Sequence, residues 1–128
     1  LTNSFYKDFS LKSERLKNSM LNFLKKAKLN GKVIIGYGAA AKANTLLNYS
    51  KVDKTLVKYV VDKNPLKQNK FLPGSHIPIV SEDQIIKLKP DYVIIFPWNL
   101  KSEIIKQLNY IKDWDGKFVL FQPKLEII

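Results

Sequence analysis

The chain is 128 residues long, with 45% apolar residues, no cysteine, one histidine and a formal net charge of +11. This length suits one folded domain, and the composition excludes disulfides, a thiolate metal site, a zinc site and a membrane-spanning helix, which needs roughly 18–20 apolar residues in a row. The basic residues are scattered lysines with Arg15 as the only arginine, so the charge predicts a solvated, anion-attracting surface and no nucleic-acid partner.

The first part of the chain predicts an amphipathic helix followed by a strand. The sequence opens without methionine or a secretory signal, so we expect a cytoplasmic protein and a piece of a longer one. Residues 10–28 place apolar side chains on one helical face, and Asn30 with Gly31 is typical of a helix end. We expect residues 1–30 to pack on one domain of residues 31–128, which begins with a buried strand at residues 33–35.

The rest of the chain alternates between helical and extended patterns. After a predicted helix at residues 40–49, four apolar runs predict strands or extended pieces, at residues 56–61, 77–80, 92–96 and 118–121. Residues 63–75 predict a long loop, because they carry Asn-Pro and Pro-Gly pairs. Ser81 and Gln84 stand at capping-box spacing before a short helix, and Asn99 predicts the N-cap of another.

This alternation, without hairpin signals, predicts an α/β fold built from right-handed βαβ crossovers. We expect a Rossmann-like, doubly wound, mostly parallel sheet of four or five strands with helices on both faces. Ligands of such sheets bind at the carboxyl ends of the strands. Four segments occupy these ends, at residues 36–44, 62–64, 97–99 and 122–123.

The first of these segments carries the strongest ligand signal. Gly36 and Gly38 permit a sharp turn between strand and helix. The helix start offers free N–H groups and partial positive charge, which suit a phosphate. Lys42 could add a charge, and Asn44 and Thr45 could add hydrogen bonds. The alternative is that the glycines and the neighbouring alanines only allow close packing of helix on strand.

The other segments hold candidates with open alternatives. Asp62 is either a ribose-binding carboxylate or the first residue of an Asx turn with Asn64. Trp98 either stacks on a base or sugar ring or packs at the rim of a helix. Asn99 favours a cap over a ligand contact. His76 has no evident proton-bearing partner in the sequence, which favours a structural or ligand-contacting role over a general base.

Four stretches read, in order, GYGAAAKANTLLNY, YVVDKNPLKQNKFLPGSHIPI, KPDYVIIFPWNLKSEI and WDGKFVLFQPKLEI. The sequences of these stretches and their order resemble the C-terminal domain of S-adenosylmethionine (SAM)-dependent sugar C-methyltransferases. The resemblance implies a longer enzyme with a zinc-binding region, a SAM-binding domain that holds the catalytic base, and this domain. It also implies that this domain helps to bind a nucleoside-diphosphate keto-deoxysugar, which is methylated beside its keto group through an enolate.

Matched position by position, the resemblance implies substrate binding by Gly36, Tyr37, Gly38, Ala40, Lys42, Asn44, Thr45, Asp62, Asn64, His76, Pro97, Trp98 and Asn99. It implies no catalytic residue, metal ligand or cofactor in this chain. Ile34 and Ile35 precede Gly36 where common SAM sites have an acidic residue, so SAM binding is not predicted here. Two positions depart from the family pattern, because Ala43 replaces a glycine and Ser75 replaces a threonine.

Two other functions share part of this pattern. An NAD(P)-binding domain of an oxidoreductase would use the same glycine turn and Asp62, but needs hydride-transfer residues from a partner domain. A non-enzymatic assembly module would use the fold only to hold another domain. The main hypothesis expects a nucleoside-diphosphate sugar and the SAM- and zinc-binding domains of the same polypeptide as partners, with no membrane partner.

Overall fold

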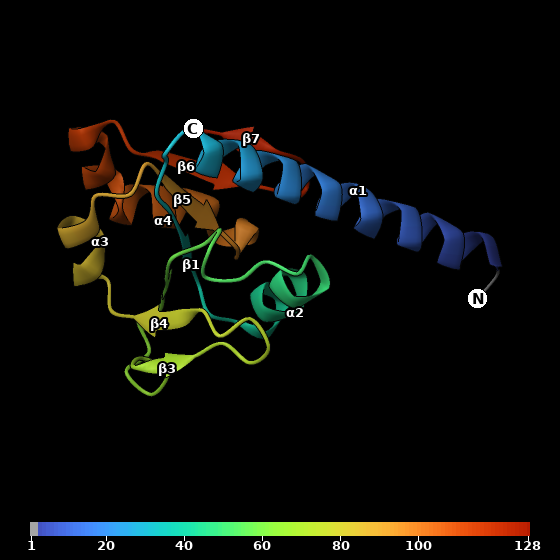
Figure 1. Cartoon of the computed structure of the whole chain (residues 1–128), viewed down its shortest axis with the longest axis horizontal. Helices are drawn as coiled ribbons and strands as arrows, with labels where there is room; N and C mark the ends of the chain where they lie inside the picture. Colours follow the sequence, from blue (N-terminus) through green and yellow to red (C-terminus); the bar gives the residue numbers. More distant parts are fainter. Residues whose placement is uncertain (1–2) are drawn as a thin grey trace.

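The computed structural model describes residues 3–128, with side chains from residue 13 onward. Over this range the chain forms one sheet of seven strands with helices packed against it (Figure 1). The helices are α1 (Asn3–Leu29), α2 (Ala41–Tyr49), α3 (Asp83–Leu88) and α4 (Lys101–Gln107), with 3-10 helices η1 (Trp98–Leu100) and η2 (Asn109–Trp114). The strands are β1 (Ile34–Tyr37), β2 (Val60–Val61), β3 (Lys70–Phe71), β4 (Pro78–Val80), β5 (Tyr92–Ile95), β6 (Lys117–Leu120) and β7 (Glu126–Ile127).

The middle of the sheet is parallel, and an antiparallel strand lies at each edge. The strand order is β3-β4-β2-β1-β5-β6-β7, with β3 antiparallel to β4 and β7 antiparallel to β6. Gly36 of β1 pairs in register with Val60 of β2 on one side and with Ile94 of β5 on the other. The carboxyl ends of the five parallel strands therefore lie along one end of the sheet, here called the carboxyl edge. The loop after β1 lies in the middle of this carboxyl edge.

Each face of the sheet has its own apolar core. One core includes Met20 and Leu24 of α1 and Leu47 of α2. The other includes Ile85 of α3 and Ile104 of α4. All four residues of β1 are buried, as expected for a strand with helices on both sides. The α/β class is thus confirmed.

The first helix is longer than predicted. α1 begins at Asn3 instead of residue 10, and its first turn holds no acidic residue that would signal a start. Its end is as predicted, because Gly31 has a φ of 71° and its N–H donates to the Lys28 carbonyl at 3.0 Å. The N-terminal part of α1 extends away from the sheet (Figure 1). None of the helices in residues 3–128 has the length and apolar character needed to cross a bilayer.

The prediction of four or five strands is wrong, because the described sheet has two additional short edge strands. β3 lies inside residues 63–75, which were predicted as a loop, and β7 was not predicted. The side chains of both strands are exposed, so neither carries the pattern of a covered strand. β2 is shorter than residues 56–61, because the N–H groups of Leu56 and Val57 bond the Asp53 carbonyl in a turn.

Two predicted helix caps are also wrong. α3 begins after Glu82, and the Ser81 hydroxyl donates to the Asp83 carboxylate instead of capping the helix. Asn99 lies inside η1, and α4 begins after Leu100 without a side-chain cap. Because a 3-10 helix precedes α4, Asn99 lies too early in the chain to cap it.

Replacement of Gly38 is expected to destabilise the fold more than replacement of Gly31. Both have positive φ, but a Cβ on Gly38 would lie 2.8 Å from Pro97 Cδ, whereas one on Gly31 would meet nothing within 4 Å. We expect Gly38→Ala to lower the free energy of unfolding by about 2–4 kcal/mol and Gly31→Ala by about 1 kcal/mol. Urea denaturation measures both, and equal losses would contradict the close approach of Gly38 to Pro97.

Candidate functional site

The loop after β1 and the start of α2 lie at the centre of the carboxyl edge. The Gly38 N–H donates to the Val61 carbonyl at 2.8 Å, and Gly38 also faces Pro97 after β5. The loop is therefore in contact with the ends of both neighbouring strands. α2 begins after Ala40, whose backbone is extended, and no described side chain caps this helix start. The first N–H groups of α2 thus lack acceptors within the helix.

Asp62, at the end of β2, holds this loop in place. One of its carboxylate oxygens accepts the Ala39 N–H at 2.9 Å, and the other accepts the Asn64 N–H at 2.9 Å. Lys67 lies 4.0 Å from the same carboxylate and donates to the Ala39 carbonyl at 3.2 Å. The Asx turn considered from the sequence is present. A ribose contact by Asp62 would share these oxygens and stays a prediction.

Tyr37 lies in a polar cluster between β1, α3 and α4. Its buried hydroxyl accepts a hydrogen bond from the Gln107 amide at 3.0 Å. Gln107 also donates to the Glu82 carboxylate, to which the Tyr110 hydroxyl donates at 3.4 Å. Burial and the nearby Glu82 charge raise the pKa of the Tyr37 hydroxyl and raise the pKa of Tyr110 to about 12. Tyr37 thus links β1 to the helices on one face of the sheet.

Gly36 serves packing on the other face of the sheet. A Cβ at this position would lie 2.5 Å from a ring carbon of Phe96. A larger residue would therefore push the aromatic ring out of its place. Close packing, the alternative considered from the sequence, thus explains why residue 36 is glycine. Glycine is required at position 38 by both its positive φ and its contact with Pro97.

The remaining predicted contacts spread along the carboxyl edge. Three of them are exposed at the start of α2 or on its first turns: Ala40, Lys42 and Thr45. Asn44 is half-buried, and its side-chain oxygen accepts from Asn48 at 3.5 Å. Asn48 also donates to the Pro73 carbonyl at 2.9 Å and so links α2 to the loop that carries His76. His76 is exposed there, with a φ of 58°.

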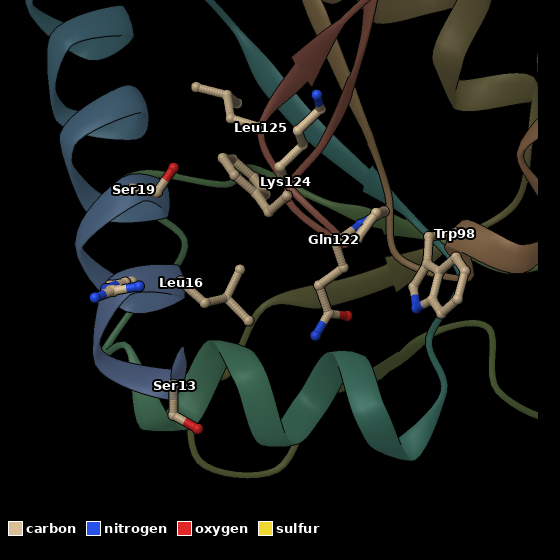
Figure 2. Close-up of a pocket in the computed structure, with 10 residues that line it drawn as sticks. Ser13, Leu16, Ser19, Trp98, Gln122, Lys124 and Leu125 are labelled. Carbon is tan, nitrogen blue, oxygen red and sulfur yellow. The ribbon is translucent and has the colours of Figure 1, made fainter. Parts of the chain in front are cut away.

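A groove of about 680 Å³ opens beside Trp98, between α1 and the segment after β6 (Figure 2). Leu16 and the Gln122 amide point into it above α2, and Trp98 lies at the end nearest the loop that enters α2 (Figure 2). Trp98 is 46% exposed. Of the residues predicted to bind substrate, Trp98 alone lines this groove among the described residues.

Sequence reasoning assigned α1 only to packing and so missed its part in the groove. Ser13 and Ser19 line the groove together with Leu16. These two serines stand three residues before and after Leu16, on the same helical face. The sequence did hold a signal for this groove. Two hydroxyl groups stand beside an apolar residue on a helical face that was expected to be buried.

The carboxyl edge offers binding chemistry for an organic anion. An uncapped helix start suits a phosphate, and an exposed indole suits stacking on a flat ring. Arg15 and Lys124 line the groove and add positive charge. In the part of the chain that the structure describes, no group of three or more His, Cys, Asp or Glu is placed to hold a metal ion.

Comparison with known proteins finds two matches. The family model described as the C-methyltransferase C-terminal domain matches residues 1–123. The chain is also 32% identical over 123 residues to the C-methyltransferase NovU of Streptomyces niveus. That match covers 96% of this chain and 29% of NovU, so the chain spans less than a third of the length of this relative.

Asp62→Ala is expected to lower the free energy of unfolding by about 2–3 kcal/mol, because the partly buried Ala39 N–H loses its acceptor. Asp53→Ala is the control, since among the described residues the exposed Asp53 carboxylate accepts only from Thr55 within its own loop, and we expect a loss of about 1 kcal/mol or less. Urea denaturation measures both. If the two losses are equal, the Asp62 carboxylate does not hold the loop after β1 in place.

Tyr110 is expected to make stability depend on alkaline pH. The pKa of its hydroxyl is about 12 in the folded chain and about 10 in an unfolded one. The unfolded chain therefore loses this proton first, so the stabilisation is complete below about pH 10 and is lost as the pH rises to about 12. In urea unfolding across this range, the free energy of unfolding should fall less steeply with pH for Tyr110→Phe than for the wild type. Identical slopes for the two proteins would contradict a raised pKa of Tyr110 in the folded chain.

Proposed function

Because the chain belongs to the C-methyltransferase C-terminal domain family, we propose that it holds the substrate of a SAM-dependent C-methyltransferase. The substrate is a nucleoside-diphosphate keto-deoxysugar, and this domain binds its diphosphate. The methyl donor and the catalytic base belong to other domains of the same polypeptide, next to a zinc-binding region. The isolated chain binds substrate and does not catalyse.

The observation that carries this proposal is the uncapped start of α2 at the centre of the carboxyl edge. Its N–H groups and partial positive charge favour a phosphate. Gly38 keeps the approach to these groups free of a side chain, and the exposed Lys42 adds a cation on the first turn. The strand order, with β1 between β2 and β5, supports a Rossmann-like assignment in which ligands bind at this point.

The residues at this edge fit a methyl donor or a dinucleotide less well. A ribose-binding site of that type uses a carboxylate at the end of the second strand. Both oxygens of Asp62 already accept backbone N–H groups, and Lys67 lies beside them. No acidic residue directly precedes Gly36 either, because Ile34 and Ile35 occupy those positions. These features support SAM binding outside this chain, and no observation favours an oxidoreductase or an assembly module.

The chain's own residues would bind and orient the substrate. The start of α2 and Lys42 would fix the diphosphate, while Asp62 keeps the loop in its binding conformation. A fixed diphosphate limits where the sugar carbon lies relative to the methyl donor, and this positioning is a major part of rate enhancement in group transfer. SAM, when bound to its own domain, supplies the methyl group to that carbon.

Titration of the 128-residue chain with dTDP by calorimetry tests the proposal. We expect binding in the micromolar to millimolar range, and Lys42→Glu should weaken it by about 10-fold or more because it replaces a charge-assisted contact with repulsion. Lys106→Glu on α4 is the matched control, since it makes the same change in net charge at an exposed position on the opposite face. It should change affinity by less than about threefold.

Two outcomes would contradict this account. A folded chain that binds no dTDP at millimolar concentration has no diphosphate site. Equal weakening by both lysine substitutions would mean that the overall positive charge, and not the start of α2, attracts the ligand.

A further inference from the structure

A second groove lies at the amino edge, the end of the sheet opposite the carboxyl edge. It has a volume of about 650 Å³. Its lining comes from the last turns of α1 and from the turn before β2, and consists of Lys25, Lys28, Leu29, Thr55 and Leu56. Because α1 leads into β1 and the turn leads into β2, this amino-edge groove lies where the parallel strands begin. A group bound at the start of α2 therefore lies at the other end of the sheet.

The amino-edge groove carries positive charge that the protein does not neutralise. Lys25, Lys28 and the neighbouring Lys54 are exposed, and no described carboxylate lies within ion-pair distance of any of them. Hydrogen bonds from Thr55 hold the pKa of the Asp53 carboxyl below its usual range, and the charges of Lys28 and Lys54 lower it further. These two lysines therefore converge on one carboxylate that is already occupied by Thr55. The ammonium groups are free to meet the carboxylates of a partner.

Positive charge continues along the amino edge beyond the groove. Four neighbouring parallel strands, β1, β2, β5 and β6, each begin at or just after an exposed lysine, namely Lys32, Lys58, Lys89 and Lys117. Asp91 and Asp115 stand at the same edge, but the Asp91 carboxylate accepts the Val33 N–H at 2.7 Å and so serves the backbone. A charged surface of this extent suits an extended acidic partner better than a single small anion.

An exposed leucine stands among these lysines. Leu29 is 87% exposed, the largest exposed fraction of any large apolar side chain in the described residues. Leu56 is half-buried in the same groove. Covering Leu29 on association would favour binding, because apolar surface leaves water. A small anion would leave this leucine in water, whereas an acidic segment with an apolar side chain would cover it.

Other occupants fit the amino-edge groove less well. A second copy of the chain carries the same net charge of +11, so two such surfaces repel each other. A flat membrane surface does not reach the half-buried Leu56 inside a concave groove. Nucleic-acid recognition relies on arginine, and the only arginine of the chain, Arg15, lines the other groove. An acidic polypeptide remains the partner that matches both the charge and the apolar lining.

We propose that the amino-edge groove docks an acidic segment of a second protein. Carboxylates of the segment pair with Lys25 and Lys28, and an apolar side chain packs on Leu29 and Leu56. The choice of a separate protein rests on the proposed function, because the domain that supplies the methyl group then faces the carboxyl edge. A partner at the opposite end of the sheet leaves the substrate site open.

Fluorescence anisotropy with a short labelled peptide tests the charge contacts. The peptide consists of glutamates with a leucine at every fourth position, and we expect it to bind the chain. Lys25→Glu with Lys28→Glu should weaken binding by at least about 10-fold, because attraction becomes repulsion. Lys70→Glu with Lys106→Glu is the matched control, since it changes the net charge equally at exposed positions on β3 and α4. This control should weaken binding by less than about threefold.

Substitution of the exposed leucine tests the apolar contact. Leu29→Ser should weaken peptide binding by about fivefold, because the leucine of the peptide loses its apolar partner. Leu66→Ser is the matched control, since Leu66 is 77% exposed in the loop after β2 and should leave the affinity unchanged. An all-glutamate peptide should bind the wild type more weakly and should not respond to Leu29→Ser. Circular dichroism confirms that each variant is folded.

Three results would overturn the inference. Equal weakening by the two pairs of lysine substitutions would mean that the overall charge attracts the peptide. Phosphatidylserine vesicles that lose binding with Leu29→Ser, while the peptide does not, would assign the groove to a membrane surface. An enzyme that also contains the SAM-binding domain should bind the peptide within about threefold of the isolated chain, and a larger loss would mean that its own domain covers the groove.

The same variants separate this inference from the proposed function. Lys25→Glu with Lys28→Glu should leave dTDP affinity within about threefold of the wild type, because the substitutions lie at the opposite end of the sheet. A folded chain that binds dTDP but not the peptide overturns the docking groove alone. A folded chain that binds the peptide but not dTDP overturns the proposed function.

Discussion

The backbone of Gly38 is held between the ends of two neighbouring strands, and the candidate site depends on this constraint. Its N–H bonds the Val61 carbonyl at 2.8 Å on one side, and its α-carbon faces Pro97 on the other. Asp62 then fixes the next N–H group, that of Ala39, at 2.9 Å. The direction in which α2 leaves the sheet follows from these contacts. The uncapped helix start and the nearby Trp98 keep their relative places for the same reason.

This constraint also assigns different tasks to residues that look alike in the sequence. Gly36 is required by the Phe96 ring on one face, and Tyr37 is held by the Gln107 amide on the other. Only from Gly38 onward does the chain face the carboxyl edge. Gly36 and Tyr37 therefore support the candidate site, and the backbone from Gly38 onward forms it.

Much of the central fold could be predicted from the sequence, because covered elements carry strong patterns. The apolar run of β1 and the glycine stop of α1 are examples. The short edge strands β3 and β7 could not be predicted, because their exposed residues lack an alternating pattern. The Asx turn of Asp62 was one of two open alternatives, since one carboxylate at a strand end fits either. Its contact with the Ala39 N–H was not predicted, because the two residues meet only in three dimensions. The groove was missed because α1 and residues 121–125 meet only in three dimensions.

The central claim is that the diphosphate of the proposed substrate binds at the start of α2. Amide chemical-shift mapping of the 15N-labelled chain, with and without dTDP, tests it most directly. The account predicts the largest shifts at the backbone N–H groups of Ala41, Lys42 and Ala43, which lie in the first turn of α2. Largest shifts instead at the separate groove lined by Lys25 and Lys28 near the end of α1, or no shifts at millimolar dTDP, would contradict it.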